Sequence, residues 1–136
     1  NNNKMATLSA TLKLEAVAGQ IASDSIALEV TDALSVISPS ITPSLITATT
    51  TGGDNIIVPN VNSAKYVYIK HTGLNSAGSS SGADKVKVET ADNTPIMELK
   101  SGEFAFFPYF AQGACKLQLQ TDANTVQVEY AYFTRA

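Results

Sequence analysis

The sequence predicts an all-β protein, an antiparallel β-sandwich or a jelly-roll-like barrel of about eight to ten short strands. Apolar and polar residues alternate in short runs along nearly the whole chain, which is the two-residue period of a half-buried strand. Clusters of Gly, Asn, Asp and Pro separate these runs at spacings of roughly 10 residues. No segment requires a long helix, and no repeat of fixed period favours a solenoid or a propeller.

Two alternating runs begin the chain. The first has an apolar face made of Leu8, Ala10, Leu12 and Leu14. The second covers residues 26–31 after a break at Gly19-Gln20 and places Ile26, Leu28 and Val30 inward. A spacing of four from Ile26 to Val30 and Leu34 also permits a helix, but β-branched residues and the lack of a capping box favour a strand.

Residues 35–64 are expected to form a loop or an edge, because Pro39 and Pro43 cannot donate hydrogen bonds within a central strand. Two short strands fit inside this region, at residues 45–50 and 55–58. Gly52-Gly53-Asp54 lies between them and is predicted to form a hairpin turn.

The run from Tyr66 to His71 is the clearest strand of the sequence. Val67 and Ile69 are predicted to face the core, so Tyr66, Tyr68 and Lys70 face the other way. Residues 85–90 alternate as well, and the simplest prediction is a hairpin of these two strands with a Gly/Ser-rich tip.

Four further segments follow, separated by turn residues. Residues 95–99 and 104–108 lie on either side of a turn at residues 100–103, and Phe104 and Phe106 are predicted as core residues. Residues 115–120 alternate cleanly. The last strand covers residues 126–132 and carries one apolar face of Val126, Val128, Tyr130 and Tyr132.

The composition fits one folded domain. The chain has 136 residues, 44% hydrophobic and 15% charged, so we expect a flexible extension over residues 1–6 and a single β-sandwich domain over residues 7–136. A net charge of −3 argues against nucleic acid as a partner. No apolar run reaches the roughly 20 residues of a membrane span. A single cysteine excludes an intrachain disulfide.

Catalytic and metal sites are weakly indicated. Cys115 and His71 could form a nucleophile–base dyad, but no orienting group is evident, and Cys115 reads more simply as a buried apolar residue. The carboxylates are scattered over turns and outward strand positions. Asp92-Asn93 and the turn at residues 122–124 are better explained as turn caps than as metal ligands. We therefore expect no enzyme, no cofactor and no metal.

Two patterns resemble nucleotide or nucleic-acid sites. The glycine-rich segment 73–82 lacks the Gly-Lys-Ser or Gly-Lys-Thr sequence of a phosphate loop. Four lysines on neighbouring expected strands flank Tyr66 and Tyr68, as in a single-strand binding platform: Lys65, Lys70, Lys85 and Lys87. A solvated, edge-protecting charged face explains these lysines better in an acidic domain.

Aromatic residues give the main candidate site, a protein interface. Three aromatic residues lie within residues 107–110, and two tyrosines and Phe133 are expected to face outward. The candidate interface residues are Tyr66, Tyr68, Phe107, Tyr109, Phe110 and Phe133. The alternative is that a second sheet of the same chain covers them.

From Lys65 onward, the chain resembles small β-sandwich virion proteins of tailed bacteriophages. The resemblance rests on Tyr66-Val67-Tyr68-Ile69-Lys70-His71-Thr72-Gly73 and Val86-Lys87-Val88-Glu89, on the segment from Leu99 to Pro108 with its Gly102-Glu103 turn, and on the C-terminal strand 126–130.

This resemblance implies a non-enzymatic virion protein present in many copies on the capsid or tail. We expect a capsid decoration (cement) subunit that binds the major capsid protein or other virion proteins and forms a homo-oligomer, by analogy a trimer. The alternative is a tail-fibre or adhesin module that binds a host glycan or another tail protein.

Overall fold

The computed structural model describes residues 4–53, 55–59, 63–111 and 116–136. These residues form nine strands and no helix, which confirms the all-β prediction. The strands are β1 (Ala6–Ala16), β2 (Ile26–Ala48), β3 (Asn55–Val58), β4 (Ser63–His71), β5 (Val86–Glu89), β6 (Pro95–Leu99), β7 (Phe104–Ala111), β8 (Leu117–Thr121) and β9 (Val126–Arg135). The chain divides into two compact units, residues 1–38 with Ala136 and residues 39–135.

The first unit is an antiparallel hairpin of β1 and the first half of β2. Its register is regular, from Ala6 opposite Val36 to Ala16 opposite Ile26. Both strands were predicted from the alternation of their residues. The register places the apolar residues of the two strands on one face, and the polar residues, such as the Thr11–Thr31 pair bonded at 3.0 Å, on the other.

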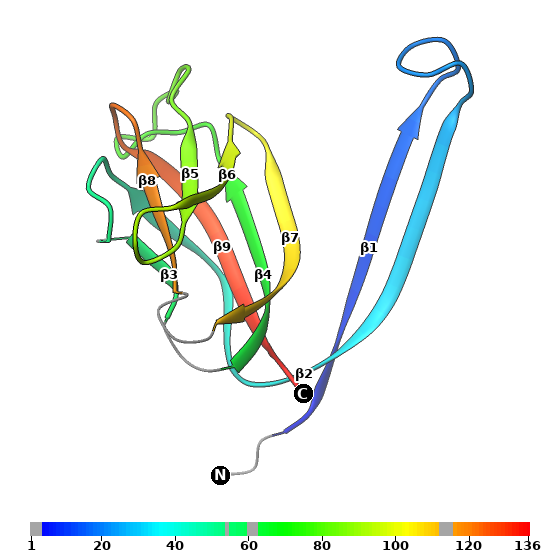
Figure 1. Cartoon of the computed structure of the whole chain (residues 1–136), viewed down its shortest axis with the longest axis horizontal. Coiled ribbons are helices and arrows are strands. Elements are labelled where there is room, and N and C mark those ends of the chain that lie inside the picture. The colour runs from blue at the N-terminus through cyan, green and yellow to red at the C-terminus, as the bar shows by residue number, and fades with distance from the viewer. Residues whose placement is uncertain (1–3, 54, 60–62, 112–115) are drawn as a thin grey trace. The chain divides into compact units, whose positions relative to one another are not determined.

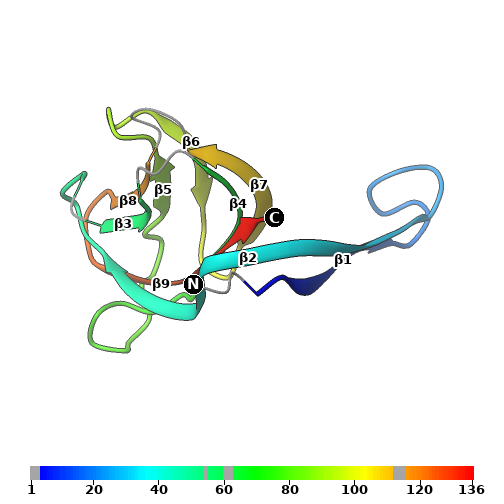
Figure 2. The same cartoon turned by 90° about the horizontal axis from the view of Figure 1, so that it is seen from below.

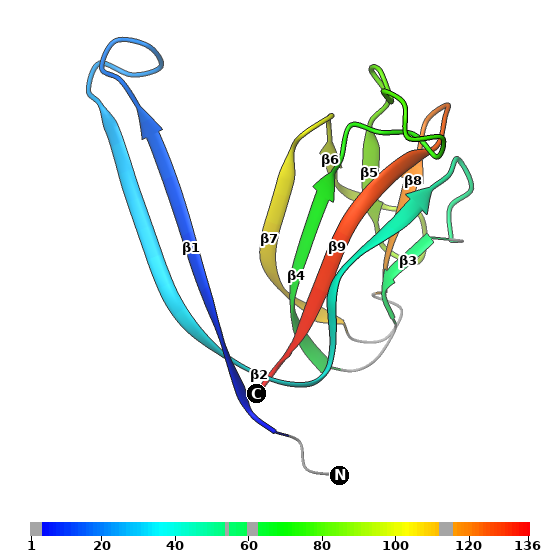
Figure 3. The ribbon, with the colours of Figure 1, turned by 180° about the vertical axis from the view of Figure 1, so that it is seen from behind.

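The second unit is a sandwich of two antiparallel sheets, as predicted. One sheet continues in the order β2-β9-β4-β7, and the other has the order β3-β8-β5-β6. Figures 1 and 3 show the two sheets facing each other from opposite sides. In Figure 2 the strands of this unit surround one region.

The core contains one inward residue from every second position of the central strands. Val67 and Ile69 of β4 are fully buried, as the sequence predicted. They belong to one cluster with buried residues of the facing strands, which include Val86, Val88, Leu117, Leu119, Val126 and Val128. This apolar layer between two sheets is the main source of stability expected for a sandwich of this size.

The predicted hairpin of β4 and β5 is wrong. β4 pairs with β7 on one side and β9 on the other, whereas β5 pairs with β6 and β8 in the opposite sheet. β5 has only 4 residues, while β7 and β9 have 8 and 10. The longer strands therefore offer the 9-residue β4 more ladder hydrogen bonds than its neighbour in sequence does.

The prediction for residues 35–64 is also wrong in part. β2 is one strand of 23 residues that runs through both Pro39 and Pro43. The pairing of β2 with β1 ends at Val36, before either proline, so that ladder loses no bond to them. The segment around Gly52 and Gly53 is not a hairpin turn, because β3 pairs with β8 and belongs to the other sheet.

Truncating a core residue should cost far more stability than truncating an exposed one. Leu119 is fully buried, so Leu119→Ala should lower the free energy of unfolding by about 2–5 kcal/mol. Leu45→Ala is the matched control, since Leu45 is 63% exposed and its loss should cost under about 1 kcal/mol. Urea unfolding of the two variants checks this, and equal losses would contradict the assignment of the core.

Candidate interaction surface

The outer face of the sheet formed by β9, β4 and β7 is aromatic. Cross-strand partners lie on the same face of a sheet, and the register pairs Tyr66 with Phe133 and Pro108, and Tyr68 with Phe106. On β7 the outward side chains are strongly exposed: 65% for Phe104, 43% for Phe106 and 54% for Phe110. We call this surface, made of Tyr66, Tyr68, Phe104, Phe106, Phe110 and Phe133, the aromatic face.

Contacts among these side chains order the aromatic face. The rings of Tyr66 and Phe106 are stacked, with centroids 6.2 Å apart and planes 14° apart. The guanidinium of Arg135 lies 5.5 Å from the centroid of the Tyr66 ring, within the range of a cation–π interaction. Rings held by their neighbours lose less conformational entropy when a partner binds, so this face is suited to recognition.

A polar contact fixes the second tyrosine. The Tyr68 hydroxyl donates a hydrogen bond of 2.7 Å to Glu129 Oε1. The pKa of Tyr68 is raised to about 12, first by burial of the hydroxyl and then by the hydrogen bond and the negative charge of Glu129. Tyr68 therefore stays neutral at physiological pH and acts as a positioned donor, not as a base.

Two of the six predicted interface residues lie elsewhere. Tyr66, Tyr68, Phe110 and Phe133 are on the aromatic face, as the alternation of β4 implied. Phe107 and Tyr109 are instead half-buried and pack against the core, with their rings edge-on at 6.2 Å.

The predicted core pair Phe104 and Phe106 is wrong, because both side chains face outward. The β7 segment carries aromatic residues at even and at odd positions, so its composition fits either orientation. The register with β4 determines which face of β7 points to the core, because Phe107 is opposite the inward Val67. No signal within β7 itself could have identified Phe104 and Phe106 as surface residues.

A second uncovered apolar surface belongs to the hairpin of the first unit. Its central residues are exposed although they are large and apolar: Leu12 48%, Leu14 50%, Leu28 44% and Val30 55%. Their alternation correctly predicted strands, but the prediction that Leu28 and Val30 face inward is wrong, because both side chains are exposed. A hairpin of two strands has no second layer of its own, so one apolar face is left open.

A polar depression of about 600 Å³ lies between loops of the second unit. Ser, Thr, Asn and Asp side chains line it, and several bond to one another, such as Asn124 Nδ2 to Asp84 Oδ2 at 2.9 Å and Thr125 Oγ1 to Ser76 Oγ at 2.8 Å. Ser81 Oγ in this lining is buried and has no partner among the described residues. The depression offers hydroxyl and amide groups, but none of its described lining residues is aromatic.

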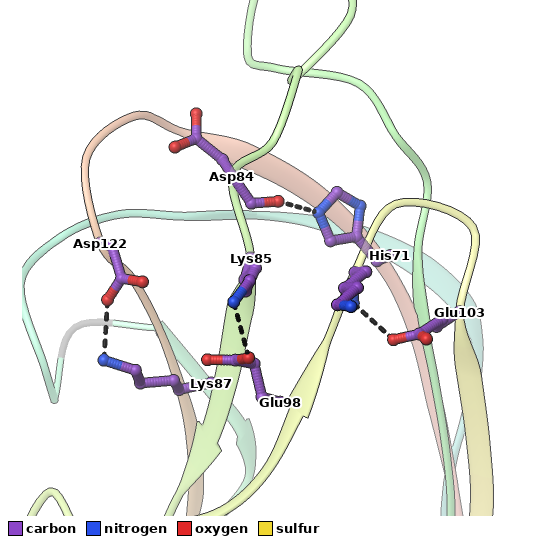
Figure 4. A network of polar contacts seen from close by, with 8 residues as sticks. His71, Asp84, Lys85, Lys87, Glu98, Glu103 and Asp122 are labelled. Atoms are coloured by element: carbon purple, nitrogen blue, oxygen red, sulfur yellow. Dashed lines mark hydrogen bonds and ion pairs between the residues drawn. The ribbon is translucent and has the colours of Figure 1, made fainter.

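Both ring nitrogens of the buried His71 are occupied by structural hydrogen bonds. The Gly73 N–H donates to Nδ1 at 2.9 Å, so Nε2 carries the proton and donates to the Asp84 carbonyl at 2.9 Å (Figure 4). These bonds tie both ends of the glycine-rich loop to the end of β4. Cys115, the other half of the hypothetical dyad, lies outside the described residues.

The four lysines of the hypothetical nucleic-acid platform do not form one surface. Lys65 is 1% exposed on the inner face of β4, where it donates to Thr134 Oγ1 at 2.9 Å, and burial lowers its pKa. Lys70 is outward on the same strand. Lys87 belongs to β5 of the opposite sheet, and Lys85 directly precedes that strand.

Cross-strand ion pairs account for the lysines next to and within β5. Lys85 pairs with Glu98 at 3.2 Å and Lys87 with Asp122 at 2.7 Å (Figure 4). No group of three or more His, Cys, Asp or Glu side chains that could hold a metal ion occurs among the described residues.

Glu89 is the one buried carboxylate of the described chain. It is 2% exposed, and its Oε1 has no hydrogen-bond partner among the described residues. Burial raises the pKa of Glu89, and the positive charge of Lys87 opposes this in part. We therefore expect the contribution of Glu89 to stability to depend on pH.

Comparisons with protein-family models, with curated proteins and with solved structures give no match. Within the described ranges the structure has no helix that is long and apolar enough to cross a membrane.

Replacing His71 should loosen the end of β4 and the loop that follows. His71→Ala removes two partly buried hydrogen bonds and a fully buried ring, so we expect a loss of roughly 2–4 kcal/mol in the free energy of unfolding. Ser79→Ala, at an exposed position in the same loop, is the control and should be nearly neutral. Similar midpoints in urea for both variants would show that the ring is not a structural anchor.

Glu89→Gln should stabilise the protein increasingly as the pH rises. Because the pKa of Glu89 is higher in the folded state, its contribution to stability is present below the unfolded value, near 4.5, and is lost as the pH rises through the folded value. Glutamine removes this dependence. Thermal unfolding from pH 4 to pH 8 should therefore show a gain for the variant that grows and then levels off, and a constant difference would contradict it.

Proposed function

We propose that the chain is a non-enzymatic structural subunit of a larger assembly, most specifically a capsid decoration (cement) subunit on the outside of a tailed-bacteriophage head. The observation that carries this proposal is the aromatic face. Phe104, Phe106 and Phe110 expose large apolar side chains from a rigid sheet, and such patches on small domains are typical of protein interfaces.

The side chains of the aromatic face suit contact with other proteins. Aromatic residues and arginine are enriched at interfaces, and here Arg135 and Tyr66 are held together before any partner binds. The sheet fixes the spacing of the rings, so a partner meets a preformed surface and little ordering cost remains. This supports recognition of another protein chain of the virion, a second copy of this subunit included.

Repeated copies would make weak contacts effective. A homo-oligomeric subunit, with a trimer as the natural choice at a local threefold axis, engages several shell subunits at once. Each engaged contact raises the effective concentration for the next. Stabilisation of the head then follows by mass action, since the subunit binds the assembled shell and not its separated parts.

A second candidate function is a tail-fibre or adhesin module that binds a host glycan. The polar depression favours it, because hydroxyl, carboxylate and amide side chains such as Ser76, Asp84 and Asn124 are suited to hydrogen bonding with sugars. The lack of an aromatic ring among its described lining residues removes the stacking platform that would strengthen sugar binding. We therefore rank this function second.

Heads assembled without this protein provide the test of the first candidate. The added protein should co-sediment with such heads and raise the temperature at which they release DNA. Phe106→Ser should weaken binding by about 30-fold, as for an interface hot spot, whereas Ser79→Ala should not change it. Binding to host cell walls that is lost in Asn124→Ala, with no binding to heads, would overturn the proposal in favour of the adhesin.

A further inference from the structure

The hairpin of β1 and β2 has a continuous apolar ladder on one face. Opposite one another on this face lie Leu8 and Leu34, Leu12 and Val30, and Leu14 and Leu28, with Ala16 and Ile26 nearest the loop. Half or nearly half of the surface of the central side chains is open to solvent. A two-stranded hairpin is marginally stable in water unless a further layer covers its apolar face, so this ladder requires a partner.

The aromatic face of the second unit is a surface of the same kind. It is a shorter sheet face that the hairpin can span: β4 and β7 pair over 8 residues, which is roughly 27 Å at about 3.4 Å per residue. The hairpin strand β1 has 11 residues, or roughly 37 Å. Sheets pack face to face through such apolar residues at a separation of about 10 Å.

The charges on the two faces are complementary. On the apolar face of the hairpin the one charged residue is Asp32, which is exposed and lies opposite Ala10. Two exposed cations, Lys70 and Arg135, lie on the same side of the sheet as the aromatic face. The carboxylate on that side, Glu129, accepts a hydrogen bond from the Tyr68 hydroxyl. Two hairpins packed on each other would instead bring two Asp32 carboxylates to one apolar interface with no cation on that face, which is unfavourable.

We propose that the apolar face of the hairpin of one copy packs on the aromatic face of a second copy, in a closed ring in which every copy donates one hairpin and receives one. This inference rests on the proposed function, because it says which two surfaces join copies of the proposed homo-oligomeric subunit. Asp32 of the donor meets Lys70 or Arg135 of the receiver.

The area that such an exchange buries supports it over contact between hairpins alone. The contact is limited by the shorter aromatic face, roughly 27 Å by 10 Å, or about 270 Å². In a closed ring each copy buries this area once on its hairpin and once on its aromatic face, about 540 Å² in all. Hairpins packed only on each other, roughly 37 Å by 10 Å, would bury about 370 Å² per copy.

Disulfide trapping tests the exchange directly. In a Cys115→Ser background, copies with Leu12→Cys are mixed with copies with Phe106→Cys and oxidised. The exchange predicts that disulfides form mainly between the two kinds of copy, and that Ser9→Cys, on the polar face of the hairpin, does not replace Leu12→Cys. Disulfides mainly between two Leu12→Cys copies, or none above the Ser9→Cys level, would overturn it.

Sedimentation velocity gives an independent readout without new cysteines. The unmodified chain should form a closed oligomer, and both Leu12→Asp and Phe106→Asp should raise its dissociation constant by roughly 30-fold or more. Ser9→Asp should leave it unchanged, and circular dichroism should show that all three variants are folded. A monomer at every concentration, or dissociation by only one of the two aspartate variants, would contradict the exchange.

The two proposals fail separately. Binding to heads with no self-association would remove the exchange and leave the decoration function in place. Self-association trapped between Leu12→Cys and Phe106→Cys without binding to heads would remove the decoration function and leave the exchange.

Discussion

Strand β4 lies between β7 and β9, and its two-residue alternation decides which side chains of all three strands face the core. Val67 and Ile69 are fully buried, and their partners Phe107 and Tyr132 are inward with them. A shift of one residue in this register would exchange the inner and outer faces of the sheet. The apolar contacts of β4 with the facing sheet therefore fix the aromatic face as well as the core.

The alternation of strand faces also explains why large apolar side chains are exposed on this chain. β7 has aromatic side chains on both faces, and only one face can contact the opposite sheet. In the first unit the ladder side chains Leu12 and Val30 are 48% and 55% exposed. Two exposed apolar faces on one small chain are costly in water unless other molecules cover them. This cost is the physical basis of both proposals.

Sequence reasoning succeeded where a strand has one clear apolar face. β4 and β9 alternate cleanly, and both strands were predicted together with the inward residues Val67, Ile69, Val126 and Val128. It failed at β7, because Phe104, Phe106, Phe107 and Tyr109 make both faces plausible. It also failed where pairing is not between neighbours in sequence: the loop after His71 leads to the opposite sheet, and so does the segment at Gly52. A local pattern reports the face of a strand and not its partner.

Radical footprinting of aromatic side chains at low protein concentration tests the central claim, the orientation of the sheet. The register predicts strong labelling of Phe104, Phe106 and Phe110 and weak labelling of Phe107 and Tyr109, all within one strand. Labelling of Phe107 and Tyr109 at the level of Phe104 would contradict the register of β4, and with it the aromatic face and both proposals.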